Sequence, residues 1–200
     1  MLKKLALTAL LALCILLPVR AASASPVTEA FIQQNFDEGY AILNSTSLSD
    51  IERRDQFRAL LQQLVANRRI ALFALGPYTS GATPAQIDAF VDAFTRHVVS
   101  LYEKELSRYN GQALQVTGST DRPDDDSVVL ADLIERGQSS RQPVNVMFRV
   151  RPDEHGRLTV TDIQVGGLSF ATIARVEIGV LMLQSNGSIS ELNRRLNGMR

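Results

Sequence analysis

The two histidines are the side chains of this sequence best suited to acid–base chemistry near neutral pH. His97 falls within a predicted helix beside the apolar positions Phe94 and Val98, and His155 falls in a predicted turn at 152–156. The sequence has no H-E-x-x-H motif, no paired histidines and a single cysteine, so it predicts no zinc site. We expect His97 to be a partly buried helix residue and His155 to be a solvated turn residue.

Other patterns that could support catalysis or cofactor binding are incomplete. No G-x-S-x-G elbow accompanies a suitable histidine, and Gly166-Gly167 belongs to neither a G-x-G-x-x-G motif nor a P-loop. The acidic turn at 121–126 lacks the alternating ligands and closing glutamate of an EF-hand loop, so a solvated hairpin turn is the better interpretation. The sequence therefore indicates no metal, no cofactor and no evident catalytic set, and we do not expect an enzyme.

Residues 1–24 have the features of a cleaved secretory signal peptide. Two lysines near the start precede an apolar run at 5–17 that only Thr8 interrupts, and Ala22-Ser23-Ala24 is a small-x-small cleavage signal. The run is shorter than the ~20 residues that a membrane-spanning helix needs. We therefore expect a Sec-type signal peptide at 1–24, a single domain at 25–200 and a periplasmic location.

The charge balance of the mature chain excludes some classes of partner. The predicted signal holds three basic residues and no acidic one, so its removal leaves a mildly acidic chain. Such a chain is not typical of a nucleic-acid binder or of a polybasic membrane-surface protein. The only cysteine, Cys14, lies in the signal, so the mature chain would form no disulfide.

Helix-start signals and apolar periodicity predict the helices that must position any site. Ser49 and Glu52 form a capping box, Thr83 and Gln86 form a second, and Ser188 begins a third with the pattern S-x-x-E. Asn67 is predicted to cap a short, nearly all-apolar helix. The predicted helices occupy about 25–43, 49–65, 67–75, 83–107, 170–184 and 188 onwards.

Between 111 and 165 the apolar period changes from 3.6 to 2, which predicts four sequential strands. Short turns join them, except for a polar connection at 137–143, so an antiparallel meander is the natural pairing. The sequence thus predicts an α+β fold with an antiparallel four-to-five-stranded sheet, covered by N-terminal and C-terminal helices. The long helix from Thr83 and the C-terminal helices offer wide apolar faces for the covering role.

The stretch 158–175 links the last predicted strand to the C-terminal helix. Asp162 breaks the alternation set by Leu158 and Val160, and the apolar positions then move to Ile163 and Val165. Either a β-bulge or a strand end produces such a change of face.

This stretch also carries a family resemblance. VTDIQVGGLS at 160–169 resembles the pattern V-x-D-V-x-V-x-G-V-S of the MlaC/toluene-tolerance family of periplasmic lipid-binding proteins. RIALFALGPY at 69–78, TPAQIDAFVDAF at 83–94 and PVNVMFRV at 143–150 resemble further family segments, in the same order along the chain.

The chain departs from the family pattern at two places. Ile173-Ala174-Arg175 stands where the family often has Asn-Tyr-Arg, and Phe148 replaces a strand tyrosine. The tail, with Arg175-Val176-Glu177-Ile178 and Asn186-Gly187-Ser188, resembles the hopanoid-associated, HpnM-like branch. The resemblance therefore leaves both a phospholipid and a hopanoid open as cargo.

The resemblance implies a monomeric periplasmic carrier that encloses acyl chains in an apolar cavity, with few groups that fix the headgroup. It further implies that the carrier shuttles lipid between an outer-membrane lipoprotein–porin complex and an inner-membrane ABC transporter complex, in support of outer-membrane lipid asymmetry. The residues expected to contact lipid are the inward apolar positions of the sheet, its covers and the junction: Phe90, Phe94, Val98, Tyr102, Val116, Val146, Phe148, Val160, Ile163, Leu168, Phe170 and Ile173.

Two other classes of function remain open at this point. One is a small hydrolase or isomerase without a metal, in which His97 would act as the base. The other is an envelope interaction module with a solid core, because apolar stripes of this kind also form ordinary cores.

Overall fold

The protein has an α+β fold in which helices and a five-stranded sheet pack around two apolar clusters. The computed structural model describes residues 25–106, 111–134 and 143–199. The predicted signal peptide at 1–24 and most of the predicted connection at 137–143 lie outside the described residues. The helices are α1 (Pro26–Leu43), α2 (Asp50–Leu64), α3 (Asn67–Leu75), the 3-10 helix η1 (Gly76–Gly81), α4 (Pro84–Leu106), α5 (Phe170–Gln184) and α6 (Ile189–Gly198). The strands are β1 (Ala113–Arg122), β2 (Asp126–Ile134), β3 (Val144–Pro152), β4 (Leu158–Val165) and β5 (Leu168–Ser169).

The helix starts follow the capping signals of the sequence. Ser49 Oγ accepts a hydrogen bond from the Glu52 N–H, and the Glu52 carboxylate accepts one from the Ser49 N–H at 2.8 Å. Thr83 and Gln86 form the same reciprocal pair at the start of α4. Asn67, however, is the first residue of α3 rather than its cap. Ala66 precedes it, held by a hydrogen bond of 2.9 Å from its N–H to the carbonyl oxygen of Val160.

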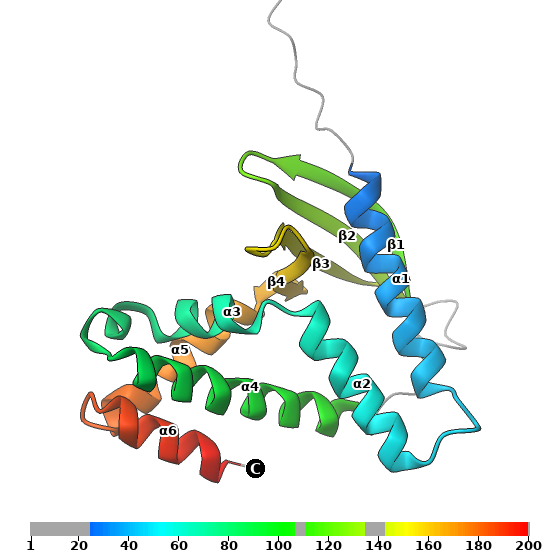
Figure 1. The fold of residues 1–200 in the computed structure, drawn as a ribbon. Coiled ribbons are helices and arrows are strands. Elements are labelled where there is room, and N and C mark those ends of the chain that lie inside the picture. The colour runs from blue at the N-terminus through cyan, green and yellow to red at the C-terminus, as the bar shows by residue number, and fades with distance from the viewer. Residues whose placement is uncertain (1–24, 107–110, 135–142, 200) are drawn as a thin grey trace, which may run out of the picture.

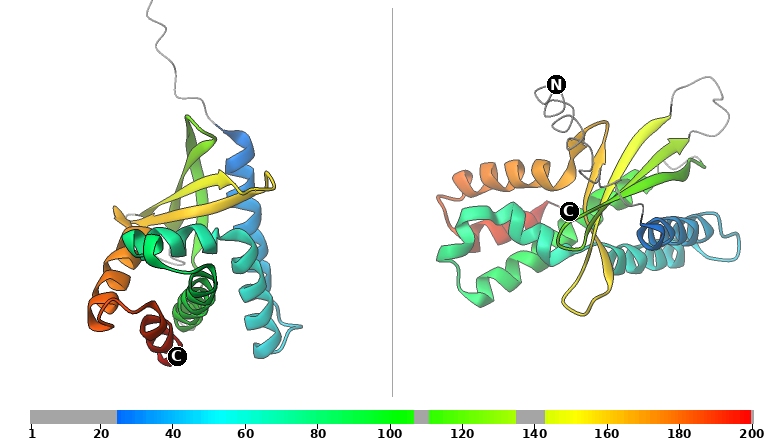
Figure 2. Two further views of the ribbon diagram at one scale, coloured as in Figure 1. Left: turned by 60° about the vertical axis from the view of Figure 1, so that its left-hand side comes forward. Right: turned by 90° about the horizontal axis from the view of Figure 1, so that it is seen from above.

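The five strands form an antiparallel meander in the order β1-β2-β3-β4-β5, which confirms the predicted pairing. Along β3, Val146, Phe148 and Val150 point to one face of the sheet, where Ile32 of α1 and Leu64 of α2 pack on them. Figure 1 shows α1 and α2 beside the strands, and the view from above in Figure 2 separates this pair from the group α3, α5 and α6. We call these buried residues around β3 the sheet cluster; it comprises Ile32, Leu64, Leu114, Val129, Ala131, Val146, Phe148, Val150 and Val160.

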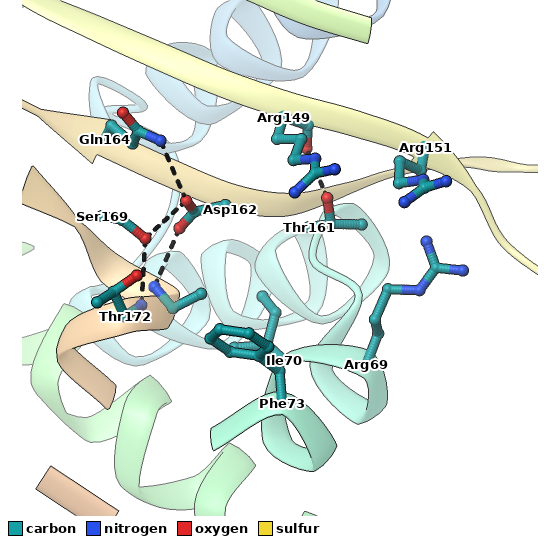
Figure 3. Close-up of a pocket in the computed structure, with 11 residues that line it drawn as sticks. Arg69, Ile70, Phe73, Arg149, Arg151, Thr161, Asp162, Gln164, Ser169 and Thr172 are labelled. Atoms are coloured by element: carbon teal, nitrogen blue, oxygen red, sulfur yellow. Dashed lines mark hydrogen bonds between the residues drawn. The ribbon is translucent and has the colours of Figure 1, made fainter. Parts of the chain in front are cut away.

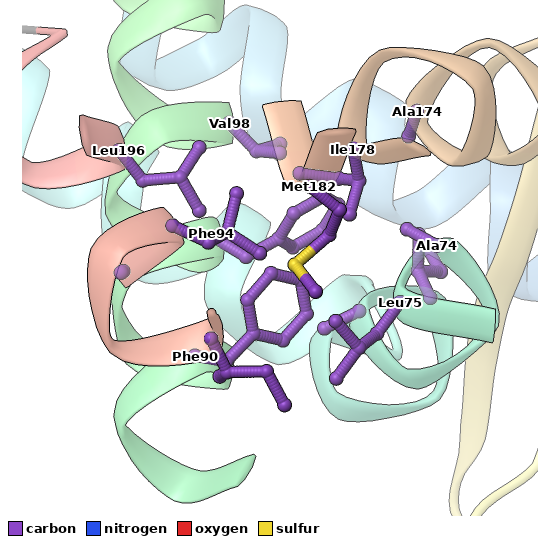
Figure 4. Packing of buried hydrophobic residues seen from close by; sticks show 14 of the residues in the cluster. Ala74, Leu75, Phe90, Phe94, Val98, Ala174, Ile178, Met182 and Leu196 are labelled. Atoms are coloured by element: carbon purple, nitrogen blue, oxygen red, sulfur yellow. The ribbon is translucent and has the colours of Figure 1, made fainter. Parts of the chain in front are cut away.

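The long helix α4 does not provide the main cover of the sheet that its wide apolar face suggested. It packs chiefly against α6 and α3, because those helices present complementary apolar stripes. Phe90 and Phe94 lie at the centre, with their ring centroids 5.8 Å apart, and Met182 of α5 reaches toward them (Figure 4). We call this second core the helical cluster; it comprises Ile70, Ala71, Ala74, Leu75, Phe90, Ala93, Phe94, Val98, Ala171, Ala174, Ile178, Met182, Ile189, Leu192 and Leu196.

A β-bulge in β4 joins the sheet to α5. Arg149 pairs with Asp162 and Val150 pairs with Val160, so Thr161 is the extra residue and the predicted change of face is confirmed. The Asp162 carboxylate then accepts hydrogen bonds from the Ser169 hydroxyl at 2.7 Å and from the Ala171 N–H at 3.0 Å. Since these groups belong to the first turn of α5 and its cap, the bulge fixes where that helix begins.

Substitution of Asp162 tests this junction. In Asp162→Ala the buried Ala171 N–H and the Ser169 hydroxyl lose their acceptor, which costs about 1–3 kcal/mol of unfolding free energy. Urea denaturation followed by circular dichroism measures the loss. Asp55→Ala is the matched control, since Asp55 forms only an exposed ion pair with Arg58. Equal denaturation midpoints for the two variants would contradict the assignment.

Candidate functional site

The predicted lipid contacts lie in both the helical cluster and the sheet cluster. Phe90, Phe94 and Val98 belong to the helical cluster, and Phe170 packs against it. Val146, Phe148 and Val160 belong to the sheet cluster, and Val116 and Ile163 pack against it. Tyr102 lies in α4, but its side chain is outside the described part of the chain.

The predicted contacts differ in how much of their surface is accessible. Phe90 and Val160 are at most 1% exposed, so in this structure they touch only neighbouring protein atoms. Val116, Ile163 and Phe170 are only partly buried and keep apolar surface that a ligand can reach.

Leu168 and Ile173 do not point inward as the sequence suggested. Leu168 is 67% exposed and Ile173 is 42% exposed. The cause is the rotation of α5, which buries Ala171, Ala174 and Ile178 and therefore turns position 173 outward. Their contact with lipid stays a prediction.

The two clusters meet at the α2–α3 junction. Val65 packs against both of them, and a parallel β-bridge pairs it with Val160 at the edge of β4. The next residue, Ala66, donates its N–H to the Val160 carbonyl, so this contact is held by backbone as well as by packing. The apolar interior is thus two packed groups connected along β4.

A cleft of about 390 Å³ opens beside this connection, between α3, β3, β4 and the start of α5 (Figure 3). Its apolar wall includes Ile70 and Phe73 of α3. Its polar wall includes three arginines that come from two elements: Arg69 of α3, and Arg149 and Arg151 of β3. No local pattern in the sequence predicts this group, because 80 positions separate Arg69 from Arg149.

The three arginines differ in how far protein groups satisfy them. Arg149 donates to both oxygens of the nearly buried Asp126, at 2.8 and 2.7 Å. Arg151 donates to the backbone carbonyl of Asp124 at 3.0 Å. Arg69 makes no hydrogen bond or ion pair with the described residues, and Figure 3 shows it extending toward Arg151.

The Asp126–Arg149 pair is fully ionised at neutral pH. The hydrogen bonds from Arg149 lower the pKa of Asp126, while its burial acts in the opposite direction. The same hydrogen bonds raise the pKa of Arg149. A bidentate carboxylate–guanidinium pair of this geometry fixes the orientation of Arg149 at the edge of the cleft.

The two histidines lie in different surroundings. His97 borders a space of about 20 Å³, enough for one water molecule, and its buried Nδ1 has no hydrogen-bond partner among the described residues. His155 is exposed in its turn, near Glu154. Across the described ranges, no three His, Cys, Asp or Glu side chains gather as a metal site would require. Among the described helices, none has both the length and the apolar character needed to cross a membrane.

Comparisons with known proteins give a family and a fold. The sequence model of the MlaC protein family matches residues 33–198. A solved structure of a phospholipid-binding protein from Ralstonia solanacearum, in complex with a phospholipid, is similar with a TM-score of 0.70. It is 20% identical in sequence, and the match covers 86% of this chain and 95% of that one. At this identity the likeness shows the fold, and it confirms the α+β architecture.

The Asp126–Arg149 pair predicts a pH dependence. Because the pKa of Asp126 lies below its usual value of 3.8, ionised Asp126 stabilises the fold above that pH, and the stabilisation is lost as the pH falls through the lowered pKa. Arg149→Gln should therefore lower the unfolding free energy more near neutral pH than in strong acid. Urea denaturation at both pH values measures the difference.

Arg68→Gln is the control, because Arg68 and Asp88 form an exposed pair whose loss changes stability little. A loss from Arg149→Gln that is the same in acid as at neutral pH would contradict the role of the pair.

Proposed function

The chain belongs to the MlaC protein family, and on that premise we propose that it is an exported carrier that binds phospholipid and moves it between the outer and inner membranes. The family match over residues 33–198 is the observation that carries this proposal. The similar fold of a protein solved with a phospholipid supports it. The signal-peptide pattern at 1–24 supports export to the periplasm.

The acyl chains are proposed to lie along the apolar surfaces that the two clusters leave accessible. Hiding a chain from water is worth about 0.8 kcal/mol per methylene, so lipid carriage needs extended apolar contact and no covalent chemistry. Val116 and Ile163 on the sheet side and Phe170 on the helix side are the proposed first contacts. The wholly buried Phe90 and Val160 would act by supporting these surfaces.

The proposed partners are those that the family resemblance implies. It loads from one membrane complex and unloads to another, an outer-membrane lipoprotein–porin complex and an inner-membrane ABC transporter complex. A carrier of this kind binds and transports without catalysing a reaction.

Lipid content tests the proposal directly. Full-length protein exported to a bacterial periplasm and purified without detergent should carry phospholipid, detected by native mass spectrometry and by lipid extraction. A hopanoid in place of phospholipid would assign the protein to the hopanoid-associated branch. Only bare polypeptide under gentle conditions would refute the carrier.

A charge in the apolar interior should abolish carriage. Ile163→Glu places a carboxylate beside Phe148, its cross-strand partner on the same face of the sheet. This should reduce co-purified lipid at least about tenfold, since an unpaired charge beside acyl chains costs several kcal/mol. Lipid per protein is measured after extraction, with circular dichroism as the test of folding.

Ile51→Glu is the matched control, because Ile51 is 68% exposed on α2. A folded Ile163→Glu variant with as much lipid as Ile51→Glu would exclude Ile163 from the lipid site.

A further inference from the structure

The cleft between α3 and β3–β4 holds more positive charge than its surroundings neutralise. Asp126 offsets the charge of Arg149. Asp162 also lines the cleft, and its carboxylate, which accepts from Ser169 and Ala171, offsets a second charge, so the positive charge of the three arginines is still in excess by one. No acidic side chain in the described residues pairs with Arg69, and Arg151 is satisfied only by a backbone carbonyl.

Two like charges that face one cleft repel each other, and an anion between them removes that repulsion. Guanidinium groups present paired N–H donors whose spacing matches two oxygens of a phosphate or a carboxylate. Arg69 can turn these donors into the cleft, and Arg151 keeps further N–H donors beside the one that binds the Asp124 carbonyl, while Arg149 is held at the edge of the cleft by Asp126. The chemistry of this wall therefore suits an oxyanion.

The opposite wall suits an apolar group. Ile70 and Ala171 are buried members of the helical cluster whose side chains reach the cleft. Phe73 is 44% exposed, and the guanidinium of Arg175 stacks on its ring, 4.9 Å from the centroid. A small inorganic ion would leave this apolar wall unused, whereas an amphiphile occupies both walls. The volume of about 390 Å³ lies in the range of small-molecule sites.

We propose that this cleft binds the phosphate of a phospholipid headgroup, with Arg69 and Arg151 as the principal donors. The proposal rests on the proposed carrier function and adds to it a fixed place for the headgroup. It departs from the expectation that the protein has few groups for the headgroup, because the arginines come together only in the folded chain.

Binding of a short-chain phospholipid tests the site. Dihexanoyl phosphatidylglycerol, used below its micelle concentration, should bind the full-length protein in isothermal titration calorimetry. The double variant Arg69→Gln/Arg151→Gln should weaken this binding at least about tenfold, since two charge-assisted contacts are lost. Raising the salt concentration should weaken binding to the wild type more than to the double variant.

Arg68→Gln is the matched control. Arg68 precedes Arg69 on α3, but it pairs with Asp88 and does not line the cleft. It should bind the lipid within about twofold of the wild type, a change too small to reflect the loss of a charge-assisted contact. Equal binding by the double variant and Arg68→Gln would overturn the proposal. Inorganic phosphate that binds as tightly as the lipid, with the same dependence on the arginines, would overturn the headgroup assignment and leave a simple oxyanion site.

Two measurements together separate this inference from the proposed function: the lipid carried from the periplasm and the binding of the short-chain lipid. If the wild type carries lipid from the periplasm and the double variant binds the short-chain lipid normally, the carrier stands and the headgroup site fails. If the wild type carries no lipid at all, the carrier itself fails. Unchanged denaturation of the double variant in urea shows that any loss of binding is not a loss of folding.

Discussion

The edge of β4 is the constraint on which the rest of the structure depends. An edge strand exposes unpaired backbone groups, and this chain uses them to attach two separate segments. Val160 accepts the N–H of Ala66 and so holds the α2–α3 junction. Farther along, Gln164 and Val165 pair with β5, which leads into α5. The helical cluster is therefore fixed to the sheet at two points of one strand.

The extra residue in the bulge makes both attachments compatible. In a strand without a bulge, Val160 and Asp162 would share one face of the sheet, because they are two positions apart. The bulge at Thr161 separates them: Val160 enters the sheet cluster, while Asp162 lies on the face of Arg149 and accepts the Ala171 N–H in the first turn of α5. One strand can thus support an apolar interior on one side and a polar cleft on the other.

How much of this could be predicted from the sequence depends on the range of the interaction. The capping pairs at Ser49 and Thr83 act within one helical turn, so their pattern predicted the helix starts. The start of α3 differs from the prediction, which had Asn67 as the cap, because the N–H of Ala66 is bound by the carbonyl of Val160, 94 positions away. The packing of α4 and the outward turn of Ile173 also depend on long-range contacts, since an apolar stripe does not specify which partner it meets. The arginine cleft was missed for the same reason.

A carrier must hold its cargo firmly enough to cross an aqueous compartment and still release it. Apolar contact alone provides affinity but does not fix the orientation of a bound lipid, because each buried methylene contributes about the same free energy wherever it lies. Charged groups at the surface act differently, since their attraction weakens when a membrane or a partner supplies competing charges. Within the described residues, Asp126 orients Arg149, while Arg69 and Arg151 have no carboxylate partner. If the proposed headgroup site and carrier function hold, an anionic partner that engages the arginines would weaken the contact with the headgroup and favour transfer of the acyl tails.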